Sequence, residues 1–207
     1  MVKQQIIDFF DTYPERTFKK GDIIIFANMN VSSVFYLVKG SVIQYDISPS
    51  GERSILNTFK PGAFFPMSNA VNQIDTPYFF EADEGVIVRV APSGDAVDFI
   101  KSHPDVLFDL LSRTYRGTDG LLLRLSELMH GDAASRILRE LYILASRFGS
   151  ESEDGRIILK KRISEVQLAE RTGLARETVS RTIKRLKEDG TVKMLDGHLS
   201  INKQSKA

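Results

Sequence analysis

The sequence predicts an α+β fold in which an antiparallel β-roll comes first, a long helix follows and a winged helix-turn-helix ends the chain. Between residues 17 and 92, short runs of β-branched and aromatic residues alternate with turn residues, as in a small β domain. Residues 103–130 instead repeat apolar side chains at helical spacing. Residues 156–207 contain 13 Lys and Arg against 6 Asp and Glu, whereas residues 1–155 contain 15 against 21. A basic C-terminal quarter on an acidic body indicates a nucleic-acid-binding module joined to another domain.

The predicted roll, residues 1–102, is built from short strands. The breaks KKGD, KG, SPSG, KPG and DEG separate these strands at the spacing of an antiparallel sandwich or barrel. Glycines at such breaks most often serve turns that require a positive φ, and we expect the same here. The strand-forming runs are 22–26, 33–47, 53–59, 78–82 and 85–90, and the turn glycines are Gly21, Gly40, Gly51, Gly62 and Gly85.

The spacing of apolar residues changes after Ser93, and the pattern in residues 103–130 predicts one long helix. Leucines and threonines recur there at steps of four and three residues, which places them on one side of the helix. We interpret this seam as a contact between two subunits, because it is longer than one small β domain can cover; the alternative is a core helix packed on its own sheet. Gly117 and Gly120 weaken the helix by about 1 kcal/mol each relative to alanine. The seam consists of Leu107, Leu111, Thr114, Thr118, Leu121, Leu125 and Leu128.

Residues 131–207 predict a winged helix-turn-helix. Asp132 can cap the first helix of this domain, and Ser164 can cap a later one that ends near Arg171. The short turn Thr172-Gly173-Leu174 then leads to a second helix opened by Ala175. The segment TVKML-DG-HLSIN alternates around an Asp-Gly turn and predicts a hairpin, the wing. The side chains expected to face inward are Val166, Leu168, Ala169, Leu174, Val179, Ile183 and Leu186.

One face of the helix after Ala175 is wholly polar, and we expect it to contact DNA bases. Arginine can bind guanine with two hydrogen bonds and glutamate can accept one from cytosine, whereas basic and hydroxyl side chains around the helix suit phosphates. A solvated amphipathic helix is the alternative, but the Gly-containing turn and the basic charge favour DNA. The expected base contacts are Arg176, Glu177, Ser180 and Arg181; the expected phosphate contacts are Ser164, Thr178, Lys160, Lys161 and Lys184, with Arg162, Thr182 and Arg185 on the flanks.

Composition argues against several classes of function. The chain has no cysteine, which excludes disulfides, thiolate metal sites and iron–sulfur clusters. A cupin-like metalloenzyme, the enzyme alternative, needs several histidines on barrel strands, but His103, His130 and His198 all lie outside the predicted roll. No P-loop, nucleophile elbow or paired-carboxylate motif occurs, so we expect no catalytic residue, metal or cofactor. With no leader-like start and no apolar run near about 18 residues, we expect a cytoplasmic protein that does not bind membranes.

The motif RETVSR in the helix after Ala175, VFYLVKGSV in the roll and HPD at the start of the long helix resemble the CRP/FNR family of dimeric bacterial transcription regulators. The resemblance covers nearly the whole chain and implies a cyclic-nucleotide-binding-like jelly roll, a dimerisation helix and a DNA-binding winged helix. It places Arg176, Glu177 and Arg181 at base-contacting positions similar to those of the cAMP-receptor branch, which implies a palindrome of TGTGA-like half-sites. Glu165 stands where the cAMP receptor has an arginine. The implied partners are double-stranded DNA, a second copy of the chain and RNA polymerase, which family activators touch near the position of the loop 150–155.

The resemblance is weaker at the positions that bind the cyclic nucleotide in other family members. Family members that bind cyclic nucleotides hold the ribose and phosphate with glycine-glutamate and arginine-serine or arginine-threonine pairs, and the corresponding places here are Pro66-Met67 and Thr76-Pro77. Residues 61–82 contain neither Lys nor Arg, so a buried phosphate would lack a counter-charge. We therefore expect the roll to sense a small apolar or aromatic molecule or no ligand; the alternative is a ligand-independent scaffold for dimerisation and polymerase contact. The residues of the expected pocket are Phe64, Phe65, Met67, Thr76, Leu121 and Leu122.

Overall fold

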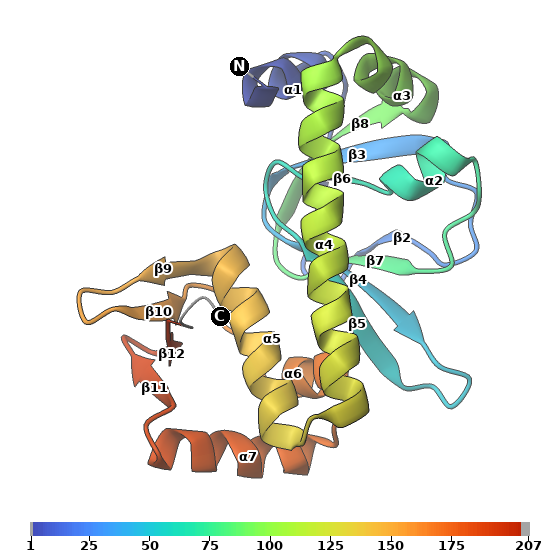
Figure 1. Cartoon of the computed structure of the whole chain (residues 1–207). Coiled ribbons are helices and arrows are strands. Elements are labelled where there is room, and N and C mark those ends of the chain that lie inside the picture. The colour runs from blue at the N-terminus through green and yellow to red at the C-terminus, as the bar shows by residue number, and fades with distance from the viewer. Residues whose placement is uncertain (1, 204–207) are drawn as a thin grey trace. The chain divides into compact units, whose positions relative to one another are not determined.

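The computed structural model describes residues 2–203 (Figure 1). By its internal contacts the chain divides into two compact units, Met1–Thr114 and Tyr115–Ala207. The division falls within the long helix α4, Pro104–His130, so that each unit contains part of this helix. Separate buried clusters form the cores of the two units.

Two four-stranded antiparallel sheets form the roll. Its strands are β1 Glu15–Phe18, β2 Ile23–Ile25, β3 Ser33–Lys39, β4 Val42–Ile47, β5 Arg53–Phe59, β6 Phe64–Phe65, β7 Phe79–Ala82 and β8 Val86–Pro92. One sheet has the order β1-β8-β3-β6 and the other has the order β2-β7-β4-β5. Every predicted run contains a strand, whereas β1 and β6 were not predicted. This arrangement confirms the predicted antiparallel roll.

The core of the roll lies between its two sheets and is rich in stacked aromatic rings. The centroids of the Phe65 and Phe80 rings, which come from different sheets, are 5.3 Å apart, and the rings are nearly parallel. The ring of Phe35 also stacks on that of Phe65, with their centroids 5.7 Å apart. Both Phe65 and Phe80 are at most 2% exposed. Stacked rings of this kind bury a large apolar area and fix the distance between the sheets.

Three helices that the sequence did not predict accompany the roll: α1 Val2–Asp11, α2 Met67–Asn72 and α3 Ser93–Ser102. A second buried cluster joins α1 and α3 to strand β3 and to the first turn of α4. Within it the ring of Phe10 stacks on Tyr36 at 4.9 Å, and Val106 is fully buried. This cluster connects the first turn of α4 to the roll.

The predicted turn glycines behave as expected at four of five positions. Gly21, Gly40, Gly51 and Gly62 all have positive φ, but the prediction is wrong for Gly85, which does not. Gly40 is also required by a close approach, because a Cβ there would collide with the Gly85 carbonyl oxygen, whereas a Cβ on Gly85 would meet open space. The two turns that contain these glycines therefore pack backbone against backbone.

The second unit contains the end of α4, three further helices and one sheet. The helices are α5 Ala133–Phe148, α6 Glu165–Thr172 and α7 Arg176–Glu188, and the strands are β9 Gly149–Glu151, β10 Arg156–Leu159, β11 Val192–Leu195 and β12 His198–Asn202. The antiparallel sheet has the order β11-β12-β10-β9. Strands β11 and β12 form the predicted wing, and both residues of its turn, Asp196 and Gly197, have positive φ, as the Asp-Gly sequence favours.

Both predicted helix caps are present. The Asp132 carboxylate accepts hydrogen bonds of 2.8 Å from the backbone N–H and from the hydroxyl of Ser135, and these bonds lower the pKa of Asp132 below its usual value. Ser164 forms a capping box with Gln167: each side chain accepts a hydrogen bond from the backbone N–H of the other residue. Such caps satisfy backbone donors that have no partner within the helix.

Helix α6 ends at Thr172, and the left-handed Gly173, with φ of 66°, turns the chain into α7 as predicted. Leu168 is 1% exposed and packs in the core of this unit, but Val166 is 45% exposed, so its predicted inward orientation is wrong. Two residues of helix correspond to about 200° of rotation, which places Val166 nearly opposite Leu168.

The two residues differ accordingly in their expected contribution to stability. We expect Leu168→Ala to lower the free energy of unfolding by about 2–5 kcal/mol, because it leaves a cavity in the core. Val166→Ala should change it by no more than about 0.5 kcal/mol. Urea denaturation of both variants measures this difference, and similar losses would show that Val166 also packs inward.

Candidate nucleic-acid interface

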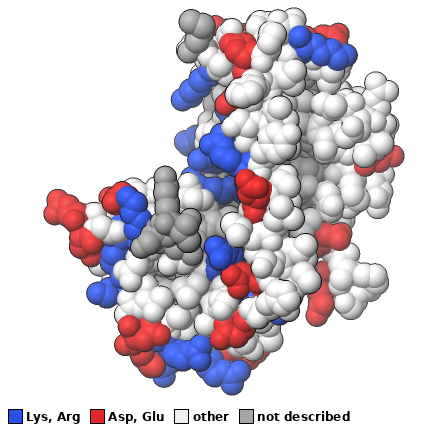
Figure 2. All heavy atoms as spheres, in the orientation of Figure 1, with Lys and Arg blue, Asp and Glu red and all other residues white. Residues whose placement is uncertain are grey.

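Helix α7 has one buried face and one exposed polar face. Val179 and Ile183 are at most 4% exposed and belong to the core of the second unit. The five side chains on the opposite face are exposed to solvent, and Figure 2 shows Lys and Arg gathered where α7 lies. These five residues, which the sequence predicted to share one face, are Arg176, Glu177, Ser180, Arg181 and Lys184.

The residues expected to contact phosphates differ in their placement. Lys160 is exposed, whereas the ammonium group of Lys161 lies 5.5 Å from the centre of the Phe148 ring. Ser164 lies at the exposed N-terminus of α6, and its hydroxyl retains a hydrogen to donate while it accepts within the capping box. Thr178 is half-buried.

Thr182 cannot serve as a flanking phosphate contact, because it is only 7% exposed. It follows Val179 by three residues and precedes Leu186 by four, and both of these residues are buried. Positions three and four residues apart lie on one face of a helix. The core face of α7 is therefore wider than the apolar pattern predicted.

Two depressions adjoin the polar face of α7. The larger, of about 460 Å³, lies between the start of α6, helix α7 and the wing, and Lys161, Arg162 and His198 contribute to its wall. The smaller, of about 330 Å³, is lined by residues that include Glu165, Ser180 and Lys184. Lys187 lines both. Of the predicted DNA contacts, Ser180 and the phosphate contacts Lys161, Ser164 and Lys184 border these depressions, whereas Arg176, Glu177 and Arg181 line neither.

Lys187 and His198 also belong to this surface, although neither was predicted from the sequence. Lys187 follows Lys184 by three residues, and this helical spacing could have indicated it. No local pattern indicates His198, because its position depends on how the wing packs against α7.

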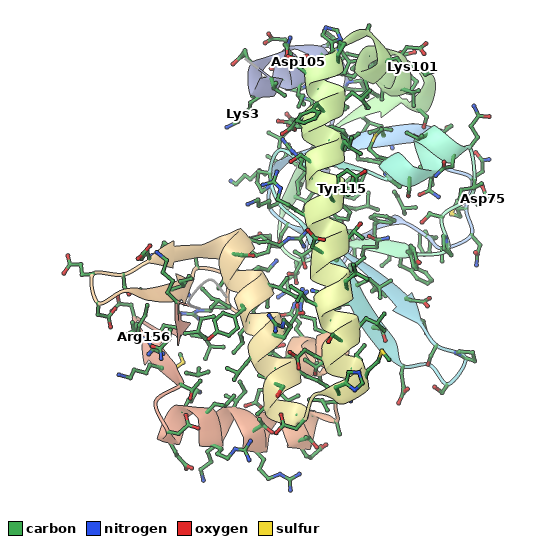
Figure 3. The ribbon with its side chains drawn as sticks, viewed as in Figure 1. Lys3, Asp75, Lys101, Asp105, Tyr115 and Arg156 are labelled. Atoms are coloured by element: carbon green, nitrogen blue, oxygen red, sulfur yellow. The ribbon has the colours of Figure 1, made fainter. Side chains whose placement is uncertain are left out.

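A buried arginine fixes the wing to the end of α7. Arg156, labelled in Figure 3, is 6% exposed and lies on β10. Its guanidinium donates to the carbonyl of Thr191 at 2.9 Å, to the carbonyl of Ser200 at 3.1 Å and to the side-chain oxygen of Asn202. Thr191 lies three residues after the end of α7, and the other two acceptors belong to β12. One side chain therefore links the end of α7 to the wing through neutral acceptors.

The residues of the expected effector pocket that belong to the first unit lie in or beside its core. Phe65 and Phe64 are 1% and 7% exposed and pack in two different core clusters. Thr76 is 1% exposed; its carbonyl accepts from the Asn28 N–H at 2.6 Å and its hydroxyl oxygen accepts from the Tyr78 N–H at 3.3 Å. These contacts account for the burial of the three residues.

The other residues of that set are more accessible. Met67 is half-buried at the start of α2. Leu121 and Leu122 belong to the second unit and are 53% and 57% exposed. The exposed position of these leucines on α4 suits a protein contact as well as a ligand contact.

Helix α4 carries two exposed apolar stripes. The five leucines of the predicted seam are between 43% and 53% exposed. A second stripe, which the sequence analysis missed, repeats every seven residues and is more exposed, at 72%, 65%, 57% and 66% in chain order: Phe108, Tyr115, Leu122 and Met129. Tyr115 is labelled in Figure 3. The seven-residue repeat could have indicated this stripe, because it typifies helices that pair along their length.

Within residues 2–203, no group of three or more His, Cys, Asp or Glu side chains is placed to hold a metal ion. No helix in the same range is long and apolar enough to cross a membrane.

Comparisons with known proteins match both units. A family model described as cyclic nucleotide-binding domain matches residues 15–103, and one described as Crp-like helix-turn-helix domain matches residues 135–206. The chain is 26% identical over 189 residues to a global nitrogen regulator of Synechocystis sp., covering 90% of this chain and 83% of the relative. It is 23% identical over 206 residues to an anaerobic regulatory protein of Haemophilus influenzae, covering 97% and 78%.

A solved structure extends the likeness to the fold. The c-di-GMP responsive global regulator CLP of Xanthomonas campestris has a TM-score of 0.78 to this chain at 16% identity. The match covers 97% of this chain and 99% of the other. At this identity the likeness concerns the fold, and it confirms the predicted fold class.

The role of Arg156 in anchoring the wing can be measured. Arg156→Lys keeps the charge but cannot reach all of the acceptors, so we expect the free energy of unfolding to fall by about 2 kcal/mol or more, since hydrogen bonds to charged groups contribute about 1.5–3 kcal/mol each. Arg162→Lys, at an exposed position, is the matched control and should change it by less than about 0.5 kcal/mol. Equal effects in urea denaturation would contradict the anchoring role.

Proposed function

Since the chain belongs to the CRP/FNR family of transcription regulators, we propose that it is a dimeric, sequence-specific DNA-binding regulator that places α7 in the major groove. The observation that carries this proposal is the exposed polar face of α7, opposite a face that is fully packed. The target is a palindrome with TGTGA-like half-sites, as the resemblance of Arg176, Glu177 and Arg181 to the cAMP-receptor branch implies.

The spacing of the polar side chains supports direct contact with bases. Arg176 and Arg181 are five residues apart, which corresponds to about 7.5 Å along the helix axis and so to about two base-pair steps of 3.4 Å. Each arginine can donate two hydrogen bonds to a guanine, while Glu177 can accept one from a cytosine amino group. Ser180 and Lys184 lie on the same face and would contact bases and phosphates respectively.

The exposed stripes of α4 support a homodimer. Apolar side chains at three- and four-residue steps pack between two helices, and a second copy of α4 offers the same spacing. A dimer with two-fold symmetry would place its two recognition helices about 34 Å apart, one turn of DNA, and would therefore bind a palindrome.

For the roll, we propose control by a small apolar or aromatic molecule or by no ligand, and not by a cyclic nucleotide. The motivating observation is that residues 61–82 supply neither Lys nor Arg for a phosphate. In the ligand-independent case the roll is a scaffold for dimerisation and for RNA polymerase, whose contact would involve the acidic hairpin tip that contains Glu151, Glu153 and Asp154.

The distinct roles of base and phosphate contacts predict distinct losses. Arg181→Ala should weaken binding to the preferred site by about 1–3 kcal/mol and relax the preference at one guanine. Lys160→Ala should weaken binding to all sequences equally. It should also reduce the slope of log K for DNA binding against log salt concentration by about one. Fluorescence anisotropy with specific and random duplexes at several salt concentrations measures both effects. Equal losses on specific and random DNA for both variants would contradict the assignment.

The dimer proposal can be tested on α4 with two neighbouring leucines. Leu122 lies on the more exposed stripe, whereas Leu123, which is 45% exposed, lies on neither stripe. We expect Leu122→Glu to convert the protein to a monomer in light scattering, because it would place two carboxylates in the apolar interface. Leu123→Glu should remain dimeric. A wild-type monomer at DNA-binding concentrations would overturn the proposal.

A further inference from the structure

A single buried carboxylate in the second unit accepts hydrogen bonds from two arginines of different helices. Glu140 lies on α5, and its side chain is 2% exposed. Arg124 of α4 donates to both of its oxygens, from Nε to Oε2 at 2.7 Å and from Nη2 to Oε1 at 2.9 Å. Arg171 of α6, whose side chain is 1% exposed, donates from Nη1 to Oε1 at 3.3 Å. Glu140 therefore connects three helices.

The geometry of these contacts restricts movement. The planar guanidinium of Arg124 meets the carboxylate with two parallel hydrogen bonds, which fix orientation as well as distance. A buried carboxylate that loses a partner is left with an uncompensated charge, so the carboxylate cannot leave Arg124 or Arg171 at little cost. The two contacts hold α4 and α6 at fixed positions relative to α5.

Further positive charge surrounds Glu140. Burial lowers the pKa of Arg147 most, the guanidinium groups of Arg124 and Arg171 lower it further, and Glu140 opposes this shift. The three arginines thus lie close enough to repel one another. The carboxylate of Glu140 offsets part of this repulsion.

The position of Arg171 connects this cluster to DNA recognition. Arg171 lies in the last turn of α6, two residues before Gly173, the left-handed residue that turns the chain into α7. A second ion pair, Glu127–Arg139 at 3.1 Å, also joins α4 to α5 but does not reach α6. Of these two connections, only the one through Glu140 continues to the helix-turn-helix.

We propose that Glu140 is a positioning residue that sets the direction of α7 relative to the C-terminal part of α4. If α4 pairs with its copy, the same contacts set the separation of the two recognition helices and hence the half-site spacing that the dimer prefers. This second consequence rests on the proposed function, whereas the first concerns one chain alone.

The first consequence is tested by a distance measurement within one chain. Because the chain has no cysteine, Ser126→Cys on α4 and Lys187→Cys on α7, both at exposed positions, give one spin-label pair per chain. Labelled protein mixed with an excess of unlabelled protein isolates that pair in a dimer. We expect Arg124→Met to shift or broaden the distance distribution, because it frees α4 from Glu140. Arg139→Met, the matched control, should leave the distribution unchanged, because both side chains of the Glu127–Arg139 pair are 23% exposed and solvent screens this pair, whereas Glu140 is buried.

The second consequence is tested with palindromes whose half-sites are moved apart or together by one base pair. We expect Arg124→Met to reduce the preference for the best spacing by about tenfold, while affinity for a single half-site stays unchanged. A merely structural role would lower the melting temperature without changing this preference. Glu140→Asp keeps the charge but shortens the side chain, and it should change the distance distribution and the spacing preference in the same direction as Arg124→Met. It replaces Arg124→Met if that variant does not fold.

The outcomes separate the two proposals. Unchanged distances and unchanged spacing preference in both Arg124→Met and Glu140→Asp would overturn the positioning role, as would an equal effect of Arg139→Met. If the wild-type protein shows no sequence preference, the proposed function fails, and the distance measurement alone decides the role of Glu140.

Discussion

The packing of Val179, Ile183 and Leu186 against α5 and α6 determines the rest of the second unit, because burial of this side of α7 leaves its other side in solvent. That exposed side carries arginine, glutamate, serine and lysine, which would be costly to bury without partners. The same packing brings the start of α6 and the wing beside α7, where Lys161 and Arg162, which precede α6, and His198 of the wing line the larger depression. The position of the proposed interface with nucleic acid is thus a consequence of where the core lies.

Local features of the chain were predictable because their causes are local. The capping residues Asp132 and Ser164, the turn at Gly173 and the Asp-Gly wing are determined by a few neighbouring side chains and by backbone preferences. The strands of the roll followed from alternating composition and turn residues. Strand β1 was missed because its sequence, ERTF, contains only one apolar residue, and β6 was missed because it is only 2 residues long.

The predictions were wrong or incomplete for residues whose burial and partners depend on tertiary contacts. Thr182 is buried because the core face of α7 is wider than its apolar residues, and Val166 is exposed although it is apolar. Arg156 and Glu140 contributed only to the charge count of the sequence, yet they bind partners on other elements in the buried part of the fold. In the roll, the segment without cations forms core and strand contacts through Phe65 and Thr76, so its aromatic composition has a structural cause beside any role in sensing.

The central claim is that the chain recognises a palindromic DNA sequence through α7 as a dimer, and selection of bound duplexes from random oligonucleotides tests it most directly. The account predicts enrichment of a palindrome with TGTGA-like half-sites whose centres are about one helical turn apart. Parallel selections with and without cell extract would show whether a small molecule is needed. Recovery of no common sequence in either selection, or of an asymmetric site without half-site repetition, would contradict the account.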